Sequence, residues 1–135
     1  MPCALENVRN HFGVNRVAQA GALASLADEG HISSVVARVE RARVRIAAIA
    51  TDNGLRALPS ATNFVTIDCG HDGAYARGLL TALGERDVFI RMPGVAPLDR
   101  CIRISTAPDD ELDVFEEELP GALKAAASRT QHQPE

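Results

Sequence analysis

Two short strand-like segments, joined by a loop, constrain the fold of this chain most strongly. Residues 88–91 (Val-Phe-Ile-Arg) and 102–104 (Ile-Arg-Ile) consist mainly of β-branched and aromatic residues, which favour strands. Pro93, Gly94 and Pro97 lie between them and interrupt regular structure. The sequence therefore predicts two strands of one sheet, and a sheet must bury at least one face against another layer.

Each of these apolar segments contains an arginine, Arg91 in the first and Arg103 in the second. A guanidinium is always charged and is rarely buried without a partner. Its planar fork matches a carboxylate or a phosphate in bidentate geometry, so one hypothesis is that both arginines bind an anionic substrate. The alternative is that each lies on a solvated strand face or pairs with an aspartate, and spacing alone favours this alternative.

Helical patterns precede these strands. Asn15 is a suitable N-cap for a helix over residues 16–28, which is rich in alanine and ends at Gly30. A second helix is predicted to start at Ser33 or Ser34 and to end at Asn53-Gly54. Its apolar residues recur at steps of three and four, and its length of roughly 30 Å is long for a small domain. We interpret it as a bracing helix.

The rest of the chain adds a strand and two further helices. Residues 63–68 predict a strand, and Asp72 is expected to cap a helix that ends at Gly84. Residues 106–109 (Thr-Ala-Pro-Asp) resemble a capping box for a last helix. Pro120 within that helix predicts a kink or a restart.

These elements predict an α/β chain of the α+β kind, with the order α-α-β-α-β-β-α. About three strands, mixed or antiparallel, are expected to form a sheet covered by helices and preceded by the bracing helix. The length of 135 residues suits one domain. Residues 1–30 are expected to be a connecting segment and helix, residues 31–127 the domain, and residues 128–135 a disordered polar tail.

Composition excludes several classes of function. The net charge of −4 argues against a nucleic-acid partner, and no apolar run reaches the ~18 residues of a membrane span. Cys3, Cys69 and Cys101 have no metal-ligand spacing and follow no signal peptide, so reduced thiols and a cytoplasmic location are expected. We expect no metal site, although Cys69, His71 and Cys101 remain a weak alternative.

The lysine content restricts the chemistry. Lys124 is the only lysine, and it lies in an alanine-rich helical segment near the C-terminus, where it should be exposed. The sequence also lacks a GxSxG elbow, a GxGxxG loop and a P-loop. No catalytic residue is therefore predicted in this chain.

Four segments together resemble one family. Residues 10–26 resemble the segment that follows the large domain in histidinol-phosphate-type aminotransferases, and residues 59–65 (Pro-Ser-Ala-Thr-Asn-Phe-Val) resemble their Pro-Ser-x-x-Asn-Phe strand. Residues 88–91 resemble their strand ending in Val-Arg, and residues 101–105 (Cys-Ile-Arg-Ile-Ser) resemble Cys-Leu-Arg-Ile-Thr. The matches occur in family order and cover roughly residues 8–125. The chain thus resembles the C-terminal small domain of fold-type I, pyridoxal-phosphate (PLP)-dependent aminotransferases.

The resemblance implies a specific activity for the complete family members. They exchange an amino group between an amino acid and a 2-oxo acid, with PLP as cofactor, and they act as homodimers. Their large domain supplies the Schiff-base lysine and most PLP ligands, none of which has a counterpart in this sequence. The resemblance therefore implies that residues 1–30 lead from a large domain, that this chain alone binds no PLP, and that it has no turnover alone.

Three residues carry over as substrate-binding residues. Arg103 matches the arginine that binds the substrate α-carboxylate, and Arg91 matches the arginine that helps bind the distal phosphate in the histidinol-phosphate branch. Asn15 falls in a loop that borders the active site in relatives. The loop after Arg91 differs from that branch, so an aromatic amino acid is an alternative substrate. Residues 106–108 also replace the usual Gly-Thr, which affects the end of the strand but not Arg103.

Two other functions remain open. The chain is alternatively a non-enzymatic, truncated product that acts as a dimerisation or regulatory module through its alanine-rich first helix. A free-standing α/β domain that binds small anions through the two arginines is a further alternative.

Overall fold

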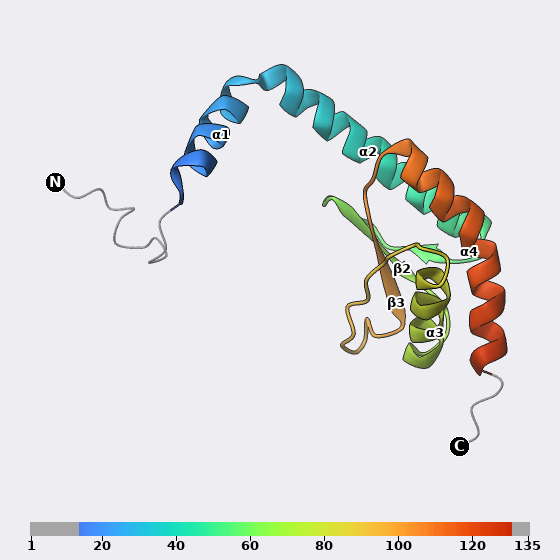
Figure 1. The fold of residues 1–135 in the computed structure, drawn as a ribbon. Coiled ribbons are helices and arrows are strands. Elements are labelled where there is room, and N and C mark those ends of the chain that lie inside the picture. The colour runs from blue at the N-terminus through green and yellow to red at the C-terminus, as the bar shows by residue number, and fades with distance from the viewer. Residues whose placement is uncertain (1–13, 131–135) are drawn as a thin grey trace. The chain divides into compact units, whose positions relative to one another are not determined.

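The computed structural model describes residues 14–130 of the chain. Four helices and a three-stranded sheet follow one another in the order α-α-β-β-α-β-α (Figure 1). The elements are α1 (Arg16–Ala27), α2 (Glu29–Asp52), β1 (Arg56–Ala57), β2 (Phe64–Asp68), α3 (Gly73–Gly84), β3 (Cys101–Ser105) and α4 (Asp109–Thr130). The chain divides into two compact units, Met1–Val36 and Ala37–Glu135. This division falls near the expected boundary after residue 30, and the domain assignment itself stays a prediction.

The predicted fold class is confirmed, and the sheet is antiparallel throughout. The element order was wrong in one place, because residues 88–91 form only an isolated bridge, between Arg91 and Arg103. The start of this segment is bound to α3 instead of β3, since the Val88 N–H donates to the Leu83 carbonyl (3.0 Å). The remaining strand of the sheet is β1, which has only two residues and pairs with the C-terminal end of β2.

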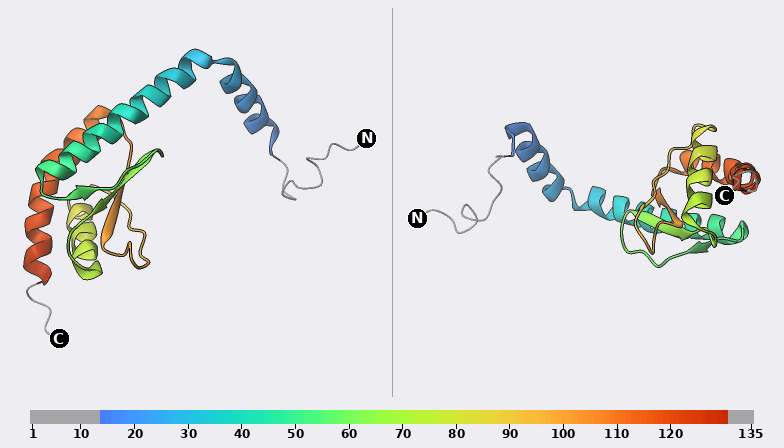
Figure 2. Two further views of the ribbon diagram at one scale, coloured as in Figure 1. Left: turned by 180° about the vertical axis from the view of Figure 1, so that it is seen from behind. Right: turned by 90° about the horizontal axis from the view of Figure 1, so that it is seen from below.

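The core of the larger unit lies on one face of the sheet. The register pairs Val65 with Ile104 and Ile67 with Ile102, so these four side chains share a face, and each is at most 5% exposed. Helices α2, α3 and α4 supply the rest of the core. Figure 2 shows the ribbon of these helices and the sheet from behind and from below. The fully or almost fully buried aliphatic and aromatic side chains of the helices are Ile46, Ile49, Leu79, Leu83, Leu112, Phe115 and Leu119.

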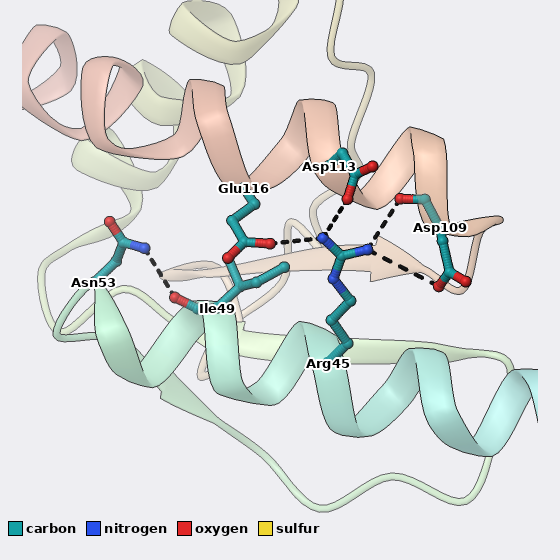
Figure 3. Close-up of polar contacts among 6 residues, drawn as sticks. All are labelled: Arg45, Ile49, Asn53, Asp109, Asp113 and Glu116. Carbon is teal, nitrogen blue, oxygen red and sulfur yellow. Dashed lines mark hydrogen bonds and ion pairs between the residues drawn. The ribbon is translucent and has the colours of Figure 1, made fainter.

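An arginine on α2 fixes this helix against α4 (Figure 3). The Arg45 guanidinium donates to Asp113 Oδ1 and to Glu116 Oε2 (2.7 Å), and also to the carbonyl of Asp109 (3.0 Å). The carboxylates of Glu116 and Asp113 raise the pKa of Arg45, with Glu116 contributing most. Ion pairs of Arg45 with three acidic side chains thus link α2 to the first turns of α4.

The start of α2 differs from the prediction. The helix begins at Glu29, because the Asp28 carboxylate accepts the N–H of His31 (2.8 Å) and takes the capping role expected of Ser33 or Ser34. The predicted end is confirmed, since α2 stops at Asp52 before Gly54, which has φ +73°. The predicted caps of α1 and α3 are also confirmed: Asn15 accepts from Ala18 N and Asp72 from Tyr75 N.

The last helix is continuous through Pro120. Figure 1 shows α4 bending along its length, as the predicted kink requires. The predicted capping box is wrong, because the Thr106 hydroxyl donates to the Asn63 carbonyl (3.0 Å) instead. The helix extends to Thr130, past residue 127, where the polar tail was expected to begin. No helix in residues 14–130 is long and apolar enough to cross a bilayer.

Candidate functional site

The structure places Arg91 and Arg103 side by side. Their backbones form an antiparallel bridge in which each residue donates its N–H to the carbonyl of the other, at 3.2 Å and 2.7 Å. Residues paired in this way project their side chains from the same face of the sheet, with Cβ atoms about 4.5–5.5 Å apart. We refer to Arg91 and Arg103 as the arginine pair.

The arginine pair lies on the face of the sheet opposite the core. Arg103 is paired with Thr66, and the residues adjacent to both in sequence point into the core. Phe64 lies on the same face, because side chains two positions apart on a strand share a face. We call this surface the outer face and define it by Phe64, Thr66, Asp68, Arg91 and Arg103. The guanidinium carbon of Arg103 is 4.7 Å from the centroid of the Phe64 ring.

Neither member of the arginine pair has a carboxylate partner within residues 14–130. This excludes pairing with an aspartate there, one form of the alternative that spacing favoured. Two like charges directly opposite each other in a sheet destabilise it. Anionic groups bound by the two guanidiniums would offset this repulsion through bidentate, charge-assisted hydrogen bonds. The geometry is therefore suited to a carboxylate or a phosphate.

In a second charged cluster on the outer face, around Asp68, the arginines already have a carboxylate partner. Asp68 Oδ2 accepts from Arg56 (2.8 Å) and Arg100, and Asp68 Oδ1 accepts from the N–H of Gly70 (2.9 Å). These donors, Arg56 foremost, hold the pKa of the Asp68 carboxyl well below its usual range. A cavity of about 580 Å³ adjoins this cluster, and its lining includes a second carboxylate, Asp99. Because two acids balance two arginines, we assign no anion site there.

Sequence reasoning missed the cluster around Asp68 and also missed Phe64. Arg56 and Asp68 are direct partners across β1 and β2. Only the strand register brings them together, and a two-residue strand leaves no periodic signal in the sequence. Phe64 had the signature of an ordinary strand aromatic, within the Pro-Ser-x-x-Asn-Phe segment.

Asn15, the third predicted substrate-binding residue, belongs to the unit Met1–Val36. Within that unit its side chain caps α1, accepting the Ala18 N–H at 2.8 Å. Its expected position beside an active site stays a prediction.

Lys124 is the only lysine in the sequence, and it is exposed on α4. A lysine that forms a Schiff base needs a site that lowers its pKa, usually through burial. No lysine is buried within residues 14–130, and the expectation that this chain alone binds no PLP stays a prediction.

The two cysteines within residues 14–130 are poorly placed for thiolate chemistry. Cys69 and Cys101 are free and buried, and burial raises the pKa of Cys69 to about 11. Within residues 14–130, no three histidine, cysteine or acidic side chains are placed to bind a metal ion. Cys3, His11 and His132 lie outside the described residues, and the cytoplasmic location inferred from the cysteines stays a prediction.

Comparison with known proteins gives a consistent set of relatives, although no family model matches the chain. Histidinol-phosphate aminotransferase 1 of Mesorhizobium japonicum is 34% identical over 112 residues, which cover 82% of this chain and 29% of the relative. Histidinol-phosphate aminotransferase 2 of Thiobacillus denitrificans is 35% identical over 127 residues, covering 90% and 34%. The chain thus spans about a third of the length of the curated relatives it matches.

Solved structures agree with the sequence relatives. Histidinol-phosphate aminotransferase from Sinorhizobium meliloti, in complex with pyridoxal-5'-phosphate, is 51% identical with a TM-score of 0.83, and the match covers 90% of this chain and 33% of that one. A putative aminotransferase from Burkholderia pseudomallei, at 24% identity and a TM-score of 0.73, shares the fold. The chain is therefore homologous to the C-terminal region of histidinol-phosphate aminotransferases, and it has the fold of that region.

Proposed function

We propose that this chain supplies the substrate-binding arginines of a PLP-dependent aminotransferase, which moves an amino group between an amino acid and a 2-oxo acid. The observation that carries the proposal is the bridge that sets Arg91 and Arg103 side by side, with no carboxylate partner for either within residues 14–130. Homology to histidinol-phosphate aminotransferases supports the reaction class. Histidinol phosphate is one candidate substrate, and an aromatic amino acid is the other.

The two arginines have different tasks in this proposal. Arg103, half-buried on β3, donates two N–H groups to the α-carboxylate of whichever substrate carries one, the amino acid or the 2-oxo acid, and so fixes its orientation. Arg91, exposed beside it, binds the distal anionic group. Orientation of this kind lowers the barrier by placing the reacting group before the chemical step begins. PLP supplies the amino-transfer chemistry in such enzymes.

The proposal assigns positioning, and no chemical step, to the chain described here. Lys124 is exposed, and no other lysine is present to attach PLP. We therefore infer that PLP attachment and turnover need the region that the relatives have beyond this match, which covers 29% to 34% of their length. Assembly of the complete enzyme as a homodimer is part of the same proposal.

Substitution of Arg103 tests the arginine pair directly. Inorganic phosphate is the probe, and side-chain N–H signals of the 15N-labelled chain report its binding. Phosphate is expected to shift the Arg91 and Arg103 signals, and Arg103→Gln is expected to weaken binding by about tenfold or more, since a charge-assisted hydrogen bond is lost. Arg41→Gln, which removes an exposed arginine from α2, is the matched control and should bind phosphate like the wild type. Equal affinity in the wild type and Arg103→Gln would contradict the proposal.

A second candidate, an association module, is favoured by α1. No residue of this helix is buried, and Val17, Leu23 and Leu26 are 83%, 70% and 73% exposed. Exposed apolar side chains on one helix favour association with another surface, here a second copy of the chain. The candidate predicts a particle larger than 14.4 kDa by gel filtration with light scattering, and its reduction to a monomer in the double variant Leu23→Ser/Leu26→Ser. A strictly monomeric wild type would count against it.

A further inference from the structure

We propose that Phe64 is a positioning residue for Arg103, holding the guanidinium by its face so that its N–H edges stay available to an anion. This inference rests on the proposed function of the arginine pair. Phe64 is paired with Ser105, and Arg103 with Thr66, so Phe64 and Arg103 are diagonal neighbours on the outer face. Diagonal neighbours are within reach of aromatic and long side chains, and the observed separation of 4.7 Å is a cation–π contact.

Three other arginines are each fixed by carboxylates instead. Arg45 is held by Asp113 and Glu116, while Arg56 and Arg100 share the carboxylate of Asp68. A carboxylate partner occupies guanidinium N–H donors and neutralises the positive charge. An aromatic ring leaves the N–H donors free and the charge in place, because it contacts the plane of the guanidinium and the donors lie at the guanidinium edge. Phe64 thus fixes Arg103 and preserves both its charge and its donors.

The position of the Phe64 ring is itself determined by the segment before β2. The Ser60 and Thr62 hydroxyls both donate to the Phe64 carbonyl, at 2.5 Å and 3.2 Å. The Thr62 hydroxyl also accepts the Phe64 N–H (3.3 Å). These bonds fix the backbone from which the ring projects. The Pro-Ser-x-x-Asn-Phe segment therefore acquires a role in orienting an arginine on a different strand.

Packing of the hydrophobic core does not explain why residue 64 is a phenylalanine. Its side chain is half-buried on the outer face, and it does not belong to the cluster of buried residues that forms the core. Leucine at this position would keep an apolar side chain and remove the ring. The fold should therefore tolerate the exchange, while the environment of Arg103 should change.

Arginine side-chain NMR on the 15N-labelled full chain tests the inference. In the wild type, the ring current of Phe64 is expected to move the Arg103 side-chain N–H protons upfield of those of Arg41. Phe64→Leu should abolish this shift and weaken phosphate binding about threefold to tenfold, the range expected for loss of a partly exposed cation–π contact. Phe64→Tyr should retain both properties. Thermal melts followed by circular dichroism confirm that each variant is folded, and Phe64→Met replaces Phe64→Leu if that variant does not melt cooperatively.

Two other outcomes would contradict the role of Phe64, and they differ in what they imply for the arginine pair. If Phe64→Leu binds phosphate like the wild type, whether or not the Arg103 signals move, the ring has no positioning role and the inference is wrong. If the Arg103 signals show the ring current but never respond to phosphate in the wild type, the proposed function of the arginine pair fails, and the inference fails with it. The two failures are distinguishable because the first leaves phosphate binding intact.

Discussion

Replacing Leu79 with alanine is expected to lower the free energy of unfolding by about 3 kcal/mol, within the range of about 2–5 kcal/mol for buried leucines. Leu79 lies on α3 and is fully buried. The loss combines the transfer free energy of the deleted atoms with the cost of the cavity they leave. Many other buried residues of this core are alanines, among them Ala76, Ala82, Ala122 and Ala126, whose side chains are too short to fill a void. The expected loss is large for a domain of this size.

Urea unfolding followed by circular dichroism measures this effect. Val44→Ala is the matched control, because Val44 is 72% exposed on α2 and its truncation should change the free energy of unfolding by less than about 0.5 kcal/mol. Similar losses for the two variants would mean that Leu79 is not a core residue of the folded chain. A changed slope against urea, rather than a changed midpoint, would show that the substitution altered the unfolded state instead.

The helix ends that depend on local chemistry were the most predictable part of the fold. Asn15 and Asp72 cap the helices they were expected to cap, because an N-cap needs only a side-chain oxygen two or three residues before the N–H groups it satisfies. The start of α2 was missed because Asp28 follows directly on α1. Sequence patterns do not show that one helix can end and the next begin within a single residue.

The strands were less predictable, because pairing is a long-range property. Residues 88–91 have high strand propensity, yet Val88 bonds to the end of α3 and only Arg91 reaches β3. Residues 87–90 and the segment that starts at the end of β3, residues 104–108, are therefore not paired with each other, and both line a cavity of about 480 Å³. β1 contributes two residues whose pairing follows from the register of β2, which local sequence does not encode.

The candidate site was predictable in its residues but not in its arrangement. An arginine in an apolar run is conspicuous, so Arg91 and Arg103 were singled out from sequence. Their opposition across a bridge required the structure, and so did the contact between Arg103 and Phe64. Neither arginine forms an ion pair within residues 14–130, and this could be known only once the structure had placed every described acidic side chain.

Removing the Asp68 side chain is expected to lower the free energy of unfolding by about 2 kcal/mol. Asp68→Ala leaves the Gly70 N–H and two guanidiniums without their acceptor, and the Asp68 side chain is only 5% exposed. The loss should stay below the ~3–5 kcal/mol of fully buried pairs, because Arg56 and Arg100 are 70% and 47% exposed and water can solvate them. Urea unfolding at neutral pH measures the loss. Asp52→Ala, at the exposed end of α2, is the control and should change stability by less than about 0.5 kcal/mol.

The same carboxylate should make the stability fall in acid. Its pKa is lowered in the folded state, whereas an aspartate in the unfolded chain titrates at about 3.9. Above about pH 5 the group is ionised in both states, and its full contribution is present. As the pH falls further, the unfolded chain binds the proton first, so the free energy of unfolding decreases until the folded carboxyl is protonated too. Asp68→Asn removes this titration, so its urea midpoint should fall less steeply than that of the wild type below about pH 4. Parallel curves for the two proteins would show that the bonds from Arg56, Arg100 and Gly70 do not stabilise the ionised form.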